Sequence, residues 1–262
     1  NGYFGVSLFF VISGFLITGV IASSPGGLFY PSFGDFYSRR AGRIFPLLTF
    51  ICLLGLLLNH WISDPSFAFT FCLRLPQGPH LSLFWISVAT FTENLFKIFI
   101  EPHGYSSSLG WGLLWSLAIE EQFYLFYPWL LKKLHNRRRM TIFLLATVLA
   151  GILSMVIASL FWHKYRIVVF NPITPYNSLA GFGLIAIGCL LYLAVEKFSK
   201  TLRGDPRLRW ILAMSGLFLM GIIYWHVKVS IDFWWMALGG TLLAAGLSLF
   251  LLGALHWNGW EA

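Results

Sequence analysis

Two adjacent carboxylates stand near the middle of an apolar stretch, in the segment WSLAIEEQFYL at 115–125. Glu120 and Glu121 are the only charged residues between Trp111 and Leu131. An ionisable side chain at the centre of a membrane helix costs about 2.5–3.5 kcal/mol on insertion scales, and such side chains usually face a bundle interior or a wet cavity. The pair is therefore expected to serve chemistry, as a proton-relay acid or as a group that orients an imidazole. A structural hydrogen bond between helices is the alternative.

One face of this segment carries further polar groups. Residues four apart share a helix face, so Ser116, Glu120 and Tyr124 form a polar stripe. Glu121 is turned about 100° away from that stripe. The two acids are therefore expected to differ in environment, with one facing a cavity and the other meeting a neighbouring helix. We expect Glu120 to matter more than Glu121 for a reaction at this site.

A second group of residues suited to chemistry follows Asp35, which is of a type that caps helices. In FYSRRAGRIFP at 36–46, Arg40 and Arg43 are three apart, so on a helix their guanidinium groups point the same way and can clamp phosphate oxygens. Pro46 is expected to kink this helix where it enters the membrane. The alternative is that these arginines only fix the topology of the next span.

Other kinds of chemistry have little support in the sequence. The seven histidines form no HxxxH or HExxH pair and the three cysteines are scattered, so neither a metal site nor a disulfide framework is expected. The sequence contains no GxSxG or Walker-type motif, and soluble hydrolase and NTPase mechanisms therefore lack their usual signatures.

The elements that position these residues are hydrophobic helices. The chain is 58% hydrophobic and only 11% charged, with a mean hydropathy of +0.74, and a spanning helix needs about 20 apolar residues. We predict an all-α fold, a polytopic transmembrane helical bundle of about seven spans plus one short or re-entrant segment at 81–96. The predicted spans are 4–22, 44–62, 111–131, 141–162, 178–195, 210–227 and 233–255.

The distribution of cations predicts how the chain is oriented in the membrane. A net charge of +8 would suggest nucleic acid as the partner of a soluble domain, but here the expected partner is the lipid bilayer. Most of the 18 lysines and arginines fall in three clusters, at 39–43, 132–139 and 197–209. If 81–96 does not cross, the clusters share one side, which the positive-inside rule makes cytoplasmic.

The opening segment GYFGVSLFFVISGFLITG at 2–19 mixes aromatic residues with small ones that permit close helix packing, Ser13 among them. Packing alone explains this composition. The segment follows Asn1 directly, with no initiator Met and no basic region before it. We therefore expect residues 1–262 to be a single membrane-embedded domain that lacks its first span and its last portion.

Three stretches, in this order, resemble the integral membrane acyltransferase-3 family of bacterial O-acyltransferases. GVSLFFVISGFLIT at 5–18 is similar to the family's second span, and FYSRRAGRIFP resembles its RxxR element. WSLAIEEQFYLFYP at 115–128 closely matches its WSLxxExQFYLxxP signature, with Trp115, Glu121 and Gln122 within it. Asn94 falls where the family commonly has an asparagine ahead of that signature.

The resemblance implies transfer of an acyl group, usually acetyl, from cytoplasmic acyl-CoA to a hydroxyl of an envelope or exported glycan or a lipid-linked sugar. Acyl-CoA would be a donor substrate, not a permanently bound cofactor, and the enzyme would lie in the bacterial inner membrane. Arg40, Arg43 and Tyr37 would bind the donor. Glu120, with Ser116 and Tyr124, would belong to the catalytic site, while the residues in supporting roles would be Ser13, Asn94, Trp115, Glu121 and Gln122.

The chain departs from the family pattern in two respects. The resemblance places the catalytic histidine on a span ahead of residue 1, and NSLAGFGLIAIG at 177–188 lacks an arginine that many members have. Two other functions therefore remain open. One is a proton-coupled transporter or flippase whose intramembrane acids bind a proton or a polar solute, although the sequence shows no internal repeat. The other is a non-catalytic partner in glycan assembly.

Overall fold

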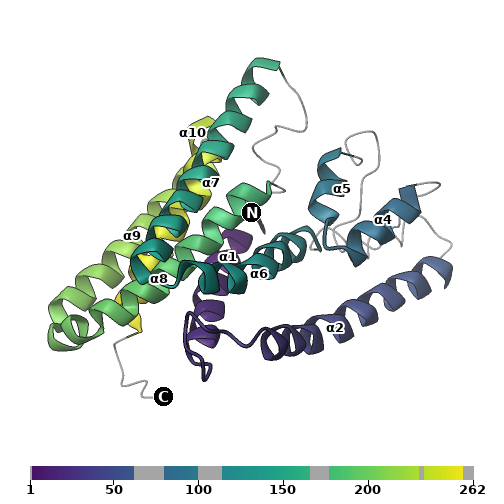
Figure 1. Cartoon of the computed structure of the whole chain (residues 1–262). Coiled ribbons are helices and arrows are strands. Elements are labelled where there is room, and N and C mark those ends of the chain that lie inside the picture. The colour runs from purple at the N-terminus through teal and green to yellow at the C-terminus, as the bar shows by residue number, and fades with distance from the viewer. Residues whose placement is uncertain (1, 62–79, 100–113, 166–176, 230–232, 256–262) are drawn as a thin grey trace. The chain divides into compact units, whose positions relative to one another are not determined.

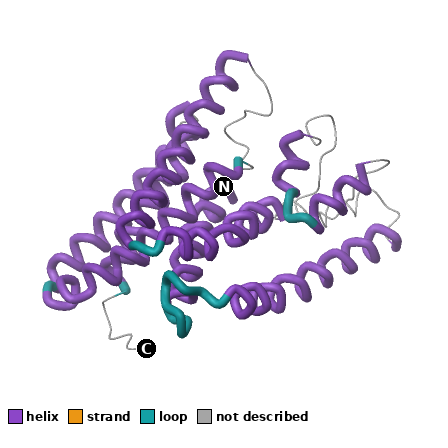
Figure 2. The backbone as a smooth tube through the Cα atoms, in the orientation of Figure 1, coloured by secondary structure: helices purple, strands orange, loops and turns teal. Residues whose placement is uncertain are grey.

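The computed structural model describes residues 2–61, 80–99, 114–165, 177–229 and 233–255. Every regular element in these ranges is a helix, as Figure 2 shows, which confirms the predicted all-α fold class. The helices, labelled in Figure 1, are α1 Gly2–Ala22, α2 Phe33–Trp61, α4 His80–Ala89, α5 Glu93–Phe99, α6 Leu114–Leu134, α7 Arg137–Tyr165, α8 Ser178–Gly204, α9 Pro206–Val229 and α10 Phe233–Ala254.

Five of these helices are by themselves long and apolar enough to cross a membrane, namely α1, α2, α7, α8 and α9. The other two predicted spans coincide with α6 and α10. α6 has 21 residues, the length of a span, but it carries the two acids. In α10 the apolar stretch of described residues covers Leu238–Ala254. The chain therefore forms a multi-pass helical membrane protein.

The segment predicted to be short or re-entrant consists of two short helices. α4 has 10 residues and α5 has 7, and neither reaches the ~20 residues of a full crossing. A turn at 90–92 separates them, in which the Thr92 amide donates to the Ser87 carbonyl at 2.8 Å. On α5, Lys97 and Glu93 form an ion pair at 3.6 Å, and both side chains are almost completely buried.

α2 joins the arginine-containing segment and the following span into one helix that runs through Pro46. The expectation that Asp35 caps this helix is wrong. The helix begins two residues earlier, at Phe33, and the Phe36 amide already donates to the Ser32 carbonyl at 3.0 Å. Asp35 lies in the first turn instead, where a carboxylate interacts favourably with the helix dipole.

The chain divides into two compact units, one of residues 1–23 and 133–262 and the other of residues 24–132. In the first unit, α8 packs against both α1 and α7, and α9 packs against α10. Arg137 at the start of α7 donates two hydrogen bonds to Glu196 near the end of α8, at 2.8 and 2.7 Å. This contact places the basic residues that follow Arg137 and those that follow Glu196 at the same end of the unit.

The small residues of the opening segment permit close helix packing, as predicted, and the helix that α1 approaches is α8. A Cβ added at Gly14 would lie 1.9 Å from the Ile185 carbonyl oxygen, and one added at Gly188 would lie 1.9 Å from that of Val11. Any side chain at these positions would push the two backbones apart. Ser13, next to Gly14, is buried in the same unit.

Gly14→Ala is therefore expected to destabilise the protein. Overpacking of this kind costs about 1–3 kcal/mol, and the melting temperature in detergent should fall by several degrees. Gly5→Ala is the matched control, because it lies on the same helix and an added Cβ there would meet nothing within 4 Å. Equal melting temperatures for the two variants would show that α1 and α8 do not pack through Gly14.

Candidate acyl-transfer site

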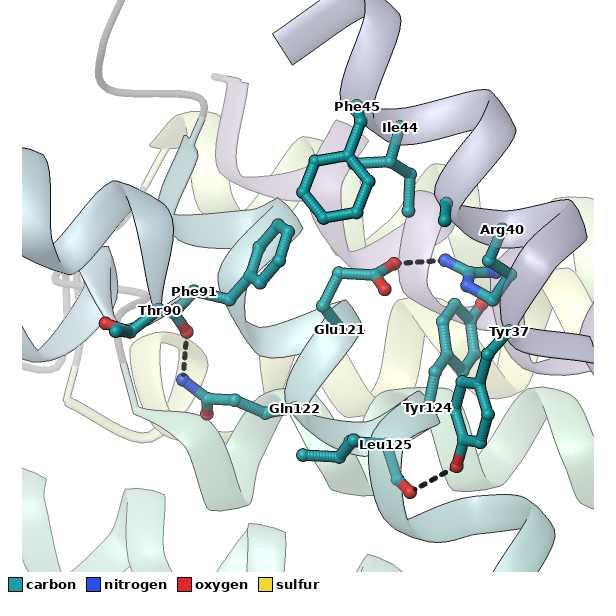
Figure 3. A pocket seen from close by; sticks show the side chains of 11 residues that line it. Tyr37, Arg40, Ile44, Phe45, Thr90, Phe91, Glu121, Gln122, Tyr124 and Leu125 are labelled. Atoms are coloured by element: carbon teal, nitrogen blue, oxygen red, sulfur yellow. Dashed lines mark hydrogen bonds and ion pairs between the residues drawn. The ribbon is translucent and has the colours of Figure 1, made fainter. Parts of the chain in front are cut away.

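The second unit, residues 24–132, brings one cation together with both acids of the signature segment. The Arg40 guanidinium donates to Glu121 Oε1, and its Nη2 lies 3.9 Å from Glu120 Oε1. The same guanidinium lies over the Tyr124 ring, with Cζ 3.8 Å from the ring centroid. Arg40 on α2 therefore contacts three residues of α6 that lie within little more than one turn, and Figure 3 shows two of them, Glu121 and Tyr124.

Charge balance distinguishes this cluster from an ordinary ion pair. One guanidinium faces two carboxylates, so the group carries one excess negative charge when both acids are ionised. Glu120 is 7% exposed, so little water can screen that charge. The cluster therefore places two acidic side chains and one basic side chain together where water has little access.

One donor in the cluster is unused. The Arg40 Nε–H is buried and has no hydrogen-bond acceptor among the residues that the structure describes. An unsatisfied buried donor costs about 1–3 kcal/mol. An oxygen atom of a ligand placed beside Arg40 would remove this cost, so the guanidinium is suited to bind a carbonyl, phosphate or hydroxyl oxygen.

A cavity of about 290 Å³ lies beside the cluster and offers space for such a ligand. This volume is at the small end of the ~300–1,000 Å³ typical of ligand pockets. Polar groups are concentrated around Arg40, whereas most of the remaining wall is apolar. The lining residues are Tyr37, Arg40, Ala41, Ile44, Phe45, Thr90, Phe91, Glu121, Gln122, Tyr124 and Leu125 (Figure 3).

Hydrogen bonds fix the wall of the cavity to α6. Gln122 Nε2 donates to the Phe91 carbonyl at 2.8 Å and to Asn94 Oδ1 at 2.9 Å. Asn94 is fully buried. The structure thus joins two residues predicted to have supporting roles and ties the turn between α4 and α5 to the helix that carries the acids.

Tyr37 ties α2 to the same helix, because its hydroxyl donates to the Leu125 carbonyl at 2.7 Å. Its ring lines the cavity beside Arg40. Of the three predicted donor-binding residues, Tyr37 and Arg40 therefore reach the cavity.

The remaining predicted residues lie outside the cavity wall. Arg43 is exposed and does not share the cavity with Arg40. Glu120 contacts Arg40 from outside the wall, and Ser116, half-buried, lies one turn before it. Trp115 is buried on α6, and Ser13 belongs to the other compact unit. The sequence left open which of the two acids faces the cavity. In the structure it is Glu121.

Sequence reasoning missed the apolar half of the wall. Ile44, Phe45, Phe91 and Leu125 line the cavity, but their residue types carry no chemical signal in an apolar chain. The one signal in the sequence was the group of polar residues around Thr92 within 81–96. It indicates that the apolar segment is interrupted there, but not how the turn is shaped. No group of three or more potential metal ligands occurs among the described residues.

The fold and the site together define a helical membrane protein with a partly buried arginine–carboxylate cluster beside a small cavity. The acyltransferase domain of the acyltransferase-3 family matches residues 1–262, and the chain belongs to this family.

Named relatives share this domain. The O-acetyltransferase OatA of Staphylococcus aureus is 25% identical over 278 residues, which cover 98% of this chain and 41% of the relative. A protein of Bacillus subtilis named as a peptidoglycan O-acetyltransferase, YrhL, is 33% identical over 129 residues, 49% of this chain and 19% of that protein. An uncharacterized protein of Haemophilus influenzae is 26% identical over 218 residues, 82% of this chain and 84% of the relative.

The chain thus spans about two fifths of the length of OatA. No solved structure matches it.

Proposed function

We propose that this domain transfers an acyl group, specifically acetyl, from acyl-CoA to a hydroxyl group of a cell-envelope glycan. The observation that carries the proposal is the Nε–H of Arg40, which has no acceptor among the described residues and lies beside a cavity and two carboxylates. Membership of an acyltransferase family supports acyl transfer. The name of a relative as a peptidoglycan O-acetyltransferase supports a glycan acceptor.

The proposed step needs a positive charge that stabilises the thioester carbonyl oxygen and a group that accepts the proton of the hydroxyl. The acceptor hydroxyl forms a bond to the thioester carbonyl carbon while its proton passes to a carboxylate, for which we propose Glu120. The carbon–sulfur bond then breaks, and the thiolate takes up a proton and leaves as free CoA. Arg40 would stabilise negative charge on the carbonyl oxygen, the kind of contribution that is often the largest in acyl transfer. Glu121 holds Arg40 in place.

Neighbouring residues have proposed roles in the same step. Tyr124 fixes the plane of the guanidinium through its ring, and Ser116 extends the polar face of Glu120 by one turn. For the donor, we propose that Arg43, exposed one turn beyond Arg40, meets the phosphate groups of CoA. Tyr37 and Arg40 would meet the thioester end, because both line the cavity.

Acyl-CoA is made in the cytoplasm, so we propose that the basic clusters face that side of the inner membrane. The Arg137–Glu196 contact supports this orientation, since it brings two of the three clusters to one end of their unit. The positive-inside rule then assigns that end to the cytoplasm.

Two single cysteines test this orientation, in a background where Cys52, Cys72 and Cys189 are replaced by alanine. Gly34→Cys and Gly204→Cys add side chains where nothing lies within 4 Å, one in each compact unit. We expect both to resist a membrane-impermeant thiol reagent in intact cells and to react after permeabilisation. Labelling of Gly204→Cys in intact cells would reverse the orientation.

The acyl-transfer function itself is tested by deleting the gene and restoring the full-length protein. Mass spectrometry of envelope glycans should show an ester-linked acetyl group that disappears on deletion and returns with the wild-type gene. A transporter or flippase would instead change the amount or location of a glycan without changing its acylation. Unchanged acylation on deletion would contradict the proposal.

A further inference from the structure

Phe91 has a backbone conformation that is unusual for its residue type. Its φ is 53°, in the left-handed region, which a bulky residue rarely adopts. Such a conformation costs about 1–3 kcal/mol and persists only where the surroundings enforce it. Strain of this kind at the wall of a cavity calls for a functional reason.

The surroundings of Phe91 enforce the conformation through hydrogen bonds on both sides of the residue. Its carbonyl accepts from Gln122 Nε2 at 2.8 Å, and its amide donates to the Val88 carbonyl at 3.3 Å. The next amide, that of Thr92, donates to the Ser87 carbonyl at 2.8 Å. The turn is therefore closed around Phe91 by α4 and α6 together.

The result is a ring placed in the wall of the cavity. Phe91 lines it from the turn and Phe45 lines it from α2, with ring centroids 6.4 Å apart and planes inclined at 59°. Figure 3 shows these rings on one side of Glu121, and Arg40 with the two tyrosines on the other. The two phenylalanine rings thus lie apart from Arg40, on the side where Thr90 and Gln122 also line the cavity.

We infer that Phe45 and Phe91 limit the length of the acyl group that the domain accepts, so that it selects a short acyl donor. The inference rests on the proposed acyl transfer. With the thioester carbonyl held at Arg40, the acyl tail points towards the two rings. Both rings line the cavity, so additional methylene groups of a longer tail would meet them. Each poorly accommodated methylene changes a specificity ratio by about 10- to 200-fold.

The test removes each ring separately in the full-length protein. Phe91→Gly suits the turn because glycine adopts positive φ without steric cost, and Phe45→Ala shortens the other wall from a different helix. Phe50→Ala is the matched control, since this phenylalanine is on α2, is 62% exposed and lies outside the cavity lining. Purified proteins in proteoliposomes receive equal concentrations of acetyl-CoA and hexanoyl-CoA, and the esters formed on the glycan acceptor are counted by mass spectrometry.

Wild-type protein and Phe50→Ala should form almost only acetyl esters. In Phe91→Gly and Phe45→Ala the ratio of hexanoyl to acetyl product should rise by about tenfold or more. A gain of a new product cannot result from misfolding, and either variant alone decides the question if the other does not insert.

Two outcomes would overturn the inference while leaving acyl transfer intact. One is an unchanged product ratio in the ring variants alongside normal acetyl transfer by the wild type, and the other is equal use of both donors by the wild type. Absence of transfer by the wild type from either donor would overturn the proposed function, and the inference with it.

Discussion

Replacing Glu120 with glutamine in the full-length protein is expected to lower acyl transfer by about 10²–10⁴-fold, the range typical of general acid–base groups. Glutamine keeps the size of the side chain and can still accept a hydrogen bond, but it cannot take up the hydroxyl proton of the acceptor. The rate should be measured at saturating acetyl-CoA, so that a change in donor affinity does not contribute.

Glu121→Gln is the matched control for this substitution. Its amide oxygen can still accept from Arg40, so the guanidinium stays in place and the loss should be clearly smaller. This comparison also tests the choice between two adjacent acids, of which Glu121 lines the cavity and Glu120 does not. If Glu121→Gln is the more damaging change at equal expression, Glu121 and not Glu120 is the proton acceptor.

Arg40→Lys is expected to lower acyl transfer by roughly 10- to 100-fold, since a hydrogen bond to a charged group contributes about 1.5–3 kcal/mol. Lysine keeps the positive charge, and with it any contribution of this position to orientation under the positive-inside rule. It cannot form the planar contacts that Arg40 makes with Glu121 and with the Tyr124 ring, and it has no Nε–H to offer a substrate. Insertion should therefore be normal while acyl transfer is slower.

Two further arginine variants separate the possible causes of such a loss. Arg137→Lys weakens another arginine–glutamate pair, that with Glu196, and should leave transfer nearly unchanged. Arg43→Lys should raise the dissociation constant for acyl-CoA several-fold, if its guanidinium meets phosphate oxygens. Normal transfer by Arg40→Lys would reduce Arg40 to a determinant of topology.

The helices could be predicted because the length and hydropathy of each apolar stretch decide whether it can span a membrane. α1, α6 and α10 fall close to their predicted positions for this reason, whereas α8 begins as predicted at Ser178 but continues to Gly204. The start of α2 could not be placed, because Asp35 is as favourable in a first turn as at a cap. The division into two compact units depends on long-range packing, which hydropathy does not contain.

The candidate site was predictable in its residues more than in its contacts. The cost of burying Glu120 and Glu121 singles them out, and the spacing of the arginines singles out Arg40. That Arg40 bonds to an acid 81 residues away could not be derived, because either arginine could face either carboxylate. The conformation of Phe91 in the cavity wall could not be predicted either, because the positive φ of this residue is imposed by hydrogen bonds from other helices.

The central claim is that Arg40 and Glu120 act as one acyl-transfer site, and a double-mutant cycle tests it most directly. Acetyl transfer at saturating donor is measured in proteoliposomes for the wild type, Arg40→Lys, Glu120→Gln and the double variant. Residues that act as a unit are strongly non-additive, so the double variant should be little slower than the slower single variant. Loss by the full product of the two single effects, or transfer at the wild-type rate in either single variant, would contradict the claim.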